Sequence, residues 1–297
     1  MKKDLPNLLI VGAAKSGTTS LHNYLNQHSD VFMCSPKEPH YLINNEIGSN
    51  RINVGITCFD KYKKLFSKGR SLKYRGESSV MYLMFPDIVI PKIKELLGDD
   101  TKIIIMLRNP IERAFSGFHH NKRYDVDENL EFDSAWDTCE ERYISNLSIS
   151  PATRYKELGL YYKQVSTFQS SFKNVHVIIY DDYKKDIKSS IKKVFEFLNL
   201  ENTEIDTTSK HMVGGWEWKY GWLKHILIKK NKFRSFWKKI IFIKSFRKLI
   251  RLVVHNKLTN STPVLSNKMK KELVNFYKHD INKTSVLLNK NLSNWLS

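Results

Sequence analysis

The stretch from Leu8 to Leu21, with the sequence LLIVGAAKSGTTSL, constrains the fold more than any other part of the chain. The apolar run Leu8 to Val11 indicates a buried strand, and the apolar residues that recur from Leu21 onward have helical spacing. Gly12 and Gly17 allow a tight loop that approaches an anion closely. A strand, such a loop and a helix together predict a phosphate-binding unit, because the N–H groups and dipole at a helix N-terminus favour negative charge.

The loop differs from the Walker A pattern of nucleotide hydrolases, in which a lysine follows the second glycine. Gly12 and Gly17 have the required spacing, but Thr18 occupies the position of that lysine, and Lys15 lies inside the loop. The apolar run 103–107 is followed by Arg108 and not by the carboxylate that holds magnesium in those enzymes. We therefore expect a site that grips an anion without a metal ion.

Two segments carry a resemblance to a known family. Residues 5–25, with KSGTTSL inside them, resemble the 5′-phosphosulfate loop of sulfotransferases that use 3′-phosphoadenosine 5′-phosphosulfate (PAPS). Residues 107–116, LRNPIERAFS, resemble the 3′-phosphate motif of the same family. In the second segment, Asn109 and Pro110 predict a helix start, with asparagine as the cap and proline at the first helical position.

The resemblance implies an α/β fold of the P-loop-like, three-layer kind, in which helices flank a central parallel sheet. It implies transfer of a sulfuryl group from PAPS to a hydroxyl or amino group of an acceptor, with 3′-phosphoadenosine 5′-phosphate (PAP) as product and no metal. The motifs are most similar to those of carbohydrate and heparan sulfate sulfotransferases, so the expected acceptor is a carbohydrate or glycolipid. The whole chain, 1–297, is expected to be one domain, with a donor-binding core over 5–200 and a basic helical part over 217–297.

Carried over residue by residue, the resemblance also assigns the donor-binding side chains. The residues assigned to the 5′-phosphosulfate, at the loop and helix start, are Lys15, Ser16, Gly17, Thr18, Thr19 and Ser20. The residues assigned to the 3′-phosphate, in the second motif, are Arg108 and Ser116. The residues assigned to the adenosine, in a later loop, are Lys210, Gly214 and Gly215. Lys15 would in addition stabilise the leaving phosphate. Arginine suits a phosphate because its guanidinium makes bidentate contacts with the oxygens.

Residues 35–41, SPKEPHY, are expected to be extended, because two prolines bracket a Lys-Glu pair. They follow the first βα unit and should lie at the carboxyl edge of the sheet. The segment resembles the K-E-P-H-[YF] stretch of carbohydrate sulfotransferases, which implies that Glu38 is the general base and that His40 orients it. Such a base is needed because the acceptor hydroxyl loses its proton as the new S–O bond forms.

Residues 76–83, GESSVMYL, provide a second candidate base, Glu77, in a segment that resembles the second sheet strand of the family. Glu77 is either the base in place of Glu38 or a partner that orients Lys15 or His40, and the sequence does not choose. Some glycan members of the family carry a catalytic lysine directly after this glutamate, where this chain has Ser78.

The formal net charge of +19 indicates an anionic partner. The excess is uneven, because no acidic residue lies between Glu217 and Glu272. Within that part, residues 219–257 alternate apolar and basic side chains, which is typical of helices whose lysines are solvated. Peripheral contact of 219–257 with an anionic membrane is the alternative, and no specific nucleic acid is expected.

The chain is expected to be cytoplasmic, or at most peripheral at the inner membrane face. Residues 1–4 lead directly toward the first strand, and no apolar run is long enough to span a bilayer. The three cysteines form no metal or disulfide pattern. Two alternative functions stay open: a P-loop nucleoside or small-molecule kinase, which would need magnesium, and a non-catalytic basic protein associated with membrane or nucleic acid.

Overall fold

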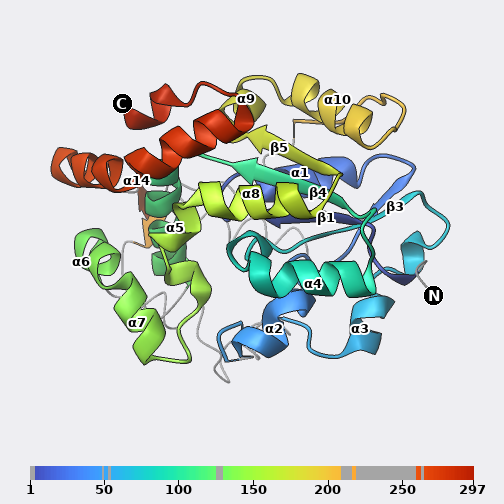
Figure 1. Cartoon of the computed structure of the whole chain (residues 1–297), viewed down its shortest axis with the longest axis horizontal. Coiled ribbons are helices and arrows are strands. Elements are labelled where there is room, and N and C mark those ends of the chain that lie inside the picture. Colours follow the sequence, from blue (N-terminus) through green and yellow to red (C-terminus); the bar gives the residue numbers. More distant parts are fainter. Residues whose placement is uncertain are drawn as a thin grey trace.

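The computed structural model describes residues 4–48, 50–52, 55–124, 130–208, 216–218, 259–261 and 264–297. Lys210, Gly214, Gly215 and the basic segment 219–257 therefore lie outside the described residues. The described part of the chain is built around a five-stranded sheet with helices on both faces (Figure 1).

All neighbouring strands of this sheet are parallel. In spatial order they are β2 (Val31–Met33), β3 (Tyr74–Ser78), β1 (Leu8–Gly12), β4 (Lys102–Leu107) and β5 (Val175–Ile179). The predicted α/β fold with a central parallel sheet is thus confirmed. Because β1 and β4 are neighbours, the two segments that resemble donor motifs begin side by side at the carboxyl edge. Two short strands, β6 (Trp216–Trp218) and β7 (Thr259–Ser261), form a separate antiparallel pair.

The helices alternate with the strands along the chain (Figure 1). They are α1 (Thr18–Leu25), α2 (Tyr41–Ile47), α3 (Phe59–Lys64), α4 (Pro86–Leu96), α5 (Pro110–Tyr124), α6 (Phe132–Asp137), α7 (Cys139–Ser145), α8 (Tyr161–Ser171), α9 (Tyr180–Lys185), α10 (Ile187–Phe197) and α14 (Asn267–Leu288). As predicted, α5 begins at Pro110, and the side chain of Asn109 accepts a hydrogen bond from the N–H of Ile111 at 3.0 Å.

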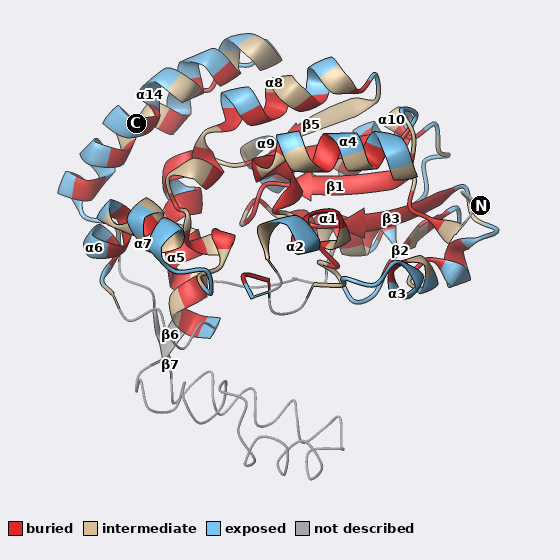
Figure 2. Ribbon diagram, turned by 60° about the horizontal axis from the view of Figure 1, so that its bottom comes forward, coloured by how far each residue is buried: buried red, intermediate tan, exposed pale blue. Residues whose placement is uncertain are grey.

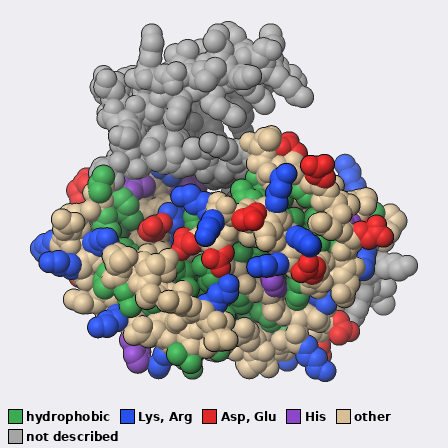
Figure 3. Space-filling model, turned by 90° about the horizontal axis from the view of Figure 1, so that it is seen from above, with side chains coloured by type: hydrophobic (Ala, Val, Ile, Leu, Met, Phe, Trp, Pro, Cys, Tyr) green, Lys and Arg blue, Asp and Glu red, His purple; other side chains and the backbone are tan. Residues whose placement is uncertain are grey.

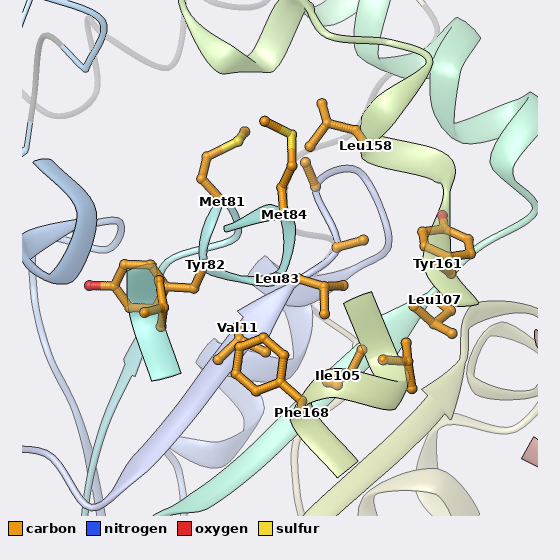
Figure 4. Close-up of a cluster of buried hydrophobic side chains, with 14 of the residues drawn as sticks. Val11, Met81, Tyr82, Leu83, Met84, Ile105, Leu107, Leu158, Tyr161 and Phe168 are labelled. Carbon is orange, nitrogen blue, oxygen red and sulfur yellow. The ribbon is translucent and has the colours of Figure 1, made fainter. Parts of the chain in front are cut away.

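The central strands are buried on both faces, so their alternate side chains build two separate apolar clusters (Figure 2). Leu9 and Val11 of β1 lie in one cluster with side chains of α4 and α8, which Figure 4 shows around Leu83, Ile105 and Phe168. Leu8 and Ile10 point to the other side, into a cluster with α1 and α10. This two-sided burial makes the sheet a rigid platform for the loops at its carboxyl edge.

The C-terminal segment packs onto this platform. Helix α14 buries one stripe of side chains that includes Leu273, Tyr277 and Ile281, and the closing turn buries Trp295 completely. This segment therefore completes one of the two apolar clusters. No described helix is both long and apolar enough to cross a bilayer. Among the described residues on the face shown in Figure 3, acidic and basic side chains are interspersed.

Candidate active site

The loop between β1 and α1 is shaped as an anion cradle. Gly17 has a φ of 89°, and a Cβ on it would lie 3.0 Å from the ring of Tyr180, so both its conformation and its surroundings require glycine. Helix α1 begins at Thr18, and Gly17 cannot supply a side-chain cap to its first N–H groups. The hydroxyl of Ser16 is buried and has no hydrogen-bond partner among the described residues. The buried Ser16 hydroxyl at the start of a helix fits a bound phosphate or sulfate group.

Lys15 lies inside this cradle with a φ of 67°. Burial, and then the positive charges of Arg123, Arg108 and Lys37, lower the pKa of Lys15 to about 8. A cluster of cations this close together is unfavourable without an anion between them. The lowered pKa of Lys15 reflects burial first and the neighbouring positive charges second, and a bound anion would favour its charged form.

Arg108 joins the end of β4 to the phosphate loop. Its Nη1 lies 3.4 Å from the carbonyl oxygen of Lys15, and its guanidinium lies over the ring of Tyr180, 5.1 Å from the ring centre. The same guanidinium donates two hydrogen bonds to one carboxylate oxygen of Glu112, at 3.1 and 2.8 Å. Glu112 is more than half exposed, so this ion pair is weak enough for a phosphate dianion to compete with it.

Helix α5 passes beside the loop. A Cβ on Gly117 would lie 3.9 Å from Cγ of Lys15, so α5 and the loop are in contact at this turn. The half-buried Ser116 precedes Gly117 in the second turn of the helix. Further along the same helix, burial and then the charges of Lys15 and Arg123 lower the pKa of His120 to about 3. The imidazole of His120 is therefore neutral. Together, Ser116, Gly117 and His120 belong to the part of α5 that borders the loop.

The prediction that residues 35–41 are extended is wrong at three positions, because Glu38 and His40 have a positive φ and Tyr41 begins α2. The segment is held in this shape by hydrogen bonds to the last residue of β3 and the two residues that follow it. The N–H of Glu38 donates to the carbonyl of Ser78 at 3.0 Å, and the N–H of His40 donates to Oγ of Ser79 at 3.0 Å. In return, the N–H of Val80 donates to Oε2 of Glu38 at 2.9 Å. Three hydrogen bonds therefore fix the main chain and the carboxylate of Glu38 at the carboxyl edge of the sheet.

Glu38 is a charged, partly accessible carboxylate. Its side chain is 25% exposed and pairs with Lys37, and Nε2 of His40 lies 3.2 Å from Oε2 without hydrogen-bond alignment. Burial by itself raises the pKa of Glu38, but Lys37 and His40 outweigh it and lower that pKa to about 2. A hydroxyl that displaces Lys37 would restore basicity to this carboxylate where proton removal is needed.

Glu77 has the opposite environment. It is fully buried, close to the phenols of Tyr62 and Tyr82. Burial raises the pKa of Glu77 to about 8, although the two nearby hydroxyls act in the opposite direction. An acceptor cannot reach this carboxyl group, which is mostly protonated at neutral pH. Of the two candidate bases, Glu38 therefore has the accessible and ionised side chain.

Lys15, Glu38 and His40 share an uncommon backbone conformation. All three have a positive φ, of 67°, 64° and 51°, and the other described non-glycine residues with positive φ are asparagines, which tolerate it better. Such conformations persist only where the surrounding structure enforces them, and they cluster at functional sites. The three residues that the sequence predicts to be catalytic therefore share an enforced backbone conformation.

Several residues differ from the sequence-based expectation. The hydroxyl of Ser20 hydrogen bonds to that of Tyr183 at 2.9 Å, so in this structure its oxygen is already engaged. Tyr161 is fully buried, and Tyr162 borders a surface cavity with α4 and α14. Ser79, whose hydroxyl accepts a hydrogen bond from the N–H of His40, carried no sequence signal of its own.

The fold and the site define a group transferase of the P-loop-like class: a phosphate cradle, an arginine that bridges to it and a positioned carboxylate meet at one sheet edge. The family described as sulfotransferase domain matches residues 5–214. The chain belongs to the sulfotransferase family.

Individual relatives agree with this assignment. A solved sulfotransferase structure from Alicyclobacillus acidocaldarius is 27% identical, covers 98% of this chain and 99% of its own, and has a TM-score of 0.74. Membrane-associated sulfotransferase kil1 of Dictyostelium discoideum is 31% identical over 52% of this chain and 31% of its own length. Human carbohydrate sulfotransferase 15 is 24% identical over 66% of this chain and 44% of its own. The chain thus spans less than half the length of these two curated relatives.

Proposed function

We propose that this protein transfers a sulfuryl group from PAPS to a hydroxyl or amino group of a carbohydrate acceptor. The observation that carries the proposal is the junction of the two donor segments, where Nη1 of Arg108 lies 3.4 Å from the carbonyl of Lys15. A ligand with phosphate groups at both ends of one nucleoside suits a site in which a phosphate loop and an arginine meet in this way.

Each residue then has a defined task. PAPS supplies the sulfuryl group. Lys15 and the N–H groups at the start of α1 hold the 5′-phosphosulfate and stabilise the negative charge that develops on the leaving phosphate. Arg108 and Ser116 hold the 3′-phosphate. Glu38 accepts the proton of the acceptor hydroxyl, and His40 and the N–H of Val80 keep its carboxylate in place.

The carbohydrate acceptor is supported by the relatives. Besides human carbohydrate sulfotransferase 15, a bifunctional heparan sulfate N-deacetylase/N-sulfotransferase 1 from Xenopus tropicalis is 32% identical over 40% of this chain and 13% of its own length. We propose that residues 1–297 work as one domain in the cytoplasm. Contact of 219–257 with the inner membrane face would be peripheral, a possibility to which the name of the Dictyostelium relative gives support.

The test is transfer of label from ³⁵S-PAPS to a panel of glycans and lipid-linked sugars, with and without EDTA. We expect labelled product from at least one carbohydrate at an undiminished rate in EDTA. Calorimetry with PAP checks donor binding independently of the acceptor. A protein that binds Mg-ATP but not PAP would be a kinase and would refute the proposal.

The lowered pKa of Lys15 predicts how donor binding depends on pH. Free protein loses the Lys15 proton near pH 8, whereas the bound anion favours the charged form. The Kd for PAP should therefore increase above about pH 8, with a slope approaching tenfold per pH unit. Calorimetric titrations between about pH 7 and pH 9.5 measure this. Lys15→Arg is the matched control, because its side chain stays charged; a steep slope in that variant would assign the effect to another group.

The ion pair between Lys37 and Glu38 predicts a shift in the acidic limb of the pH–rate profile. Lys37→Met keeps most of the aliphatic stem but removes the charge that lowers the pKa of Glu38. We expect the acidic limb of kcat/KM to move up by roughly one to three pH units. Lys37→Arg retains the charge and should leave the limb in place. An unchanged limb in Lys37→Met would show that Lys37 does not tune the base.

A further inference from the structure

The main chain of Arg108 is held by a residue outside both donor segments. The hydroxyl of Tyr161, at the start of α8, donates a hydrogen bond of 2.8 Å to the carbonyl oxygen of Arg108. Tyr161 is fully buried, and its ring lies beside Leu107, the last residue of β4 (Figure 4). This contact fixes the peptide unit from which the Arg108 side chain extends toward the phosphate loop.

Tyr161 is in turn fixed by the C-terminal helix. The carboxylate of Asp280 in α14 accepts hydrogen bonds from the N–H groups of Tyr161 at 2.7 Å and Tyr162 at 3.1 Å. A carboxylate at this position also interacts favourably with the dipole of α8. The ring of Trp295 meets Tyr161 edge to face, with centres 6.2 Å apart. The first residue of α8 is therefore held by two residues more than a hundred positions later in the chain.

A second branch reaches the other end of the Arg108 side chain. Nε1 of Trp295 donates to Oδ2 of Asp181 at 2.8 Å. Asp181 follows Tyr180, over whose ring the guanidinium of Arg108 lies. The C-terminal segment thus supports both the carbonyl of Arg108, through Tyr161, and the aromatic platform under its guanidinium, through Asp181.

We propose that Tyr161 and Asp181 are positioning residues for the 3′-phosphate of the donor. They touch no donor atom; they hold Arg108 from both ends in the geometry that meets that phosphate. This inference rests on the proposed function, since it requires that Arg108 binds the 3′-phosphate. Loss of either the Tyr161 hydroxyl or the Asp181 carboxylate should therefore lower the affinity for a nucleotide with a 3′-phosphate. The affinity for a nucleotide without that phosphate should stay the same.

The test compares the affinities of the full chain for PAP and for adenosine 5′-phosphate, which lacks the 3′-phosphate, by calorimetry. Tyr161→Phe should weaken PAP about three- to tenfold and change adenosine 5′-phosphate by less than about twofold. Asp181→Ala, at a half-buried site, should weaken PAP about two- to threefold with the same selectivity. Arg108→Gln defines the full contribution of the guanidinium to discrimination between the two nucleotides.

Tyr74→Phe is the matched control, because Tyr74 is also a buried tyrosine that donates 2.8 Å to a main-chain carbonyl, that of Leu198, away from the site. It should lower thermal stability to a similar degree and keep the ratio of the two affinities. Wild-type protein that does not prefer PAP would refute the proposed function. Wild-type preference that survives in both Tyr161→Phe and Asp181→Ala, or is lost equally in Tyr74→Phe, would overturn this inference alone.

Discussion

Lys15→Ala should reduce kcat/KM for sulfuryl transfer by about 10³-fold. The ammonium group is the positive charge of the phosphate loop, and burial, followed by the charges of Arg123, Arg108 and Lys37, lowers its pKa to about 8. Charge that develops on the leaving phosphate is stabilised there by a donor that burial shields from solvent, which makes the contribution large. Initial rates with saturating acceptor, measured against PAPS concentration, give the change.

The control for this variant is Lys61→Ala, which removes an exposed lysine on α3. It should leave both kcat and the KM for PAPS unchanged. Circular dichroism would show whether Lys15→Ala keeps its fold. If folded Lys15→Ala retained a rate within about threefold of wild type, Lys15 would have no part in the transition state.

Glu38→Gln should lower kcat by about 10²- to 10³-fold while the Kd for PAP stays the same. The amide keeps the size of the side chain and can still accept the N–H of Val80, but it cannot take a proton. Because Glu38 contacts the acceptor and not the donor in the proposed mechanism, turnover and donor affinity should separate. Single-turnover rates and calorimetry on the same preparation measure the two quantities.

Glu77→Gln is the matched comparison, because it makes the same chemical change at a buried carboxyl group. With a pKa of about 8, Glu77 is mostly neutral at pH 7, so a neutral amide should keep kcat within about threefold. A large loss in Glu77→Gln together with a small one in Glu38→Gln would reverse the assignment of the base.

The sequence predicted the parts of the site that depend on local chemistry. A short apolar run, two glycines and the first helix fixed the phosphate loop, and Asn109 with Pro110 fixed the start of α5. Glycine, proline and apolar spacing act through the backbone over a few residues, so they can be interpreted without knowing the rest of the molecule. The parallel sheet was expected from the family resemblance that these motifs carry, and the structure has it.

Residues that act through distant partners were not predictable in this way. In the sequence, Tyr161 has no feature that links it to Arg108 or Asp280. Its proposed positioning role depends on hydrogen bonds with these two residues, which lie 53 and 119 positions away. Ser79 is one serine among several, yet its hydroxyl accepts a hydrogen bond from the N–H of His40, because β3 ends beside residues 35–41. Such roles arise from which strand ends are neighbours, and no local pattern encodes that.

By itself, the sequence determined that the chain folds around a phosphate-binding loop. It also determined that Glu38 and Glu77 are the two candidates for the general base. The tertiary structure alone shows how their environments differ. Glu38 and Glu77 are the same residue type, but one lies beside Lys37 and His40 with its carboxylate partly open, and the other is sealed among aromatic rings. Neighbouring positive charge stabilises an ionised carboxylate, and burial destabilises it. The sequence therefore places a glutamate at each position, and the tertiary structure determines whether its carboxyl group is ionised.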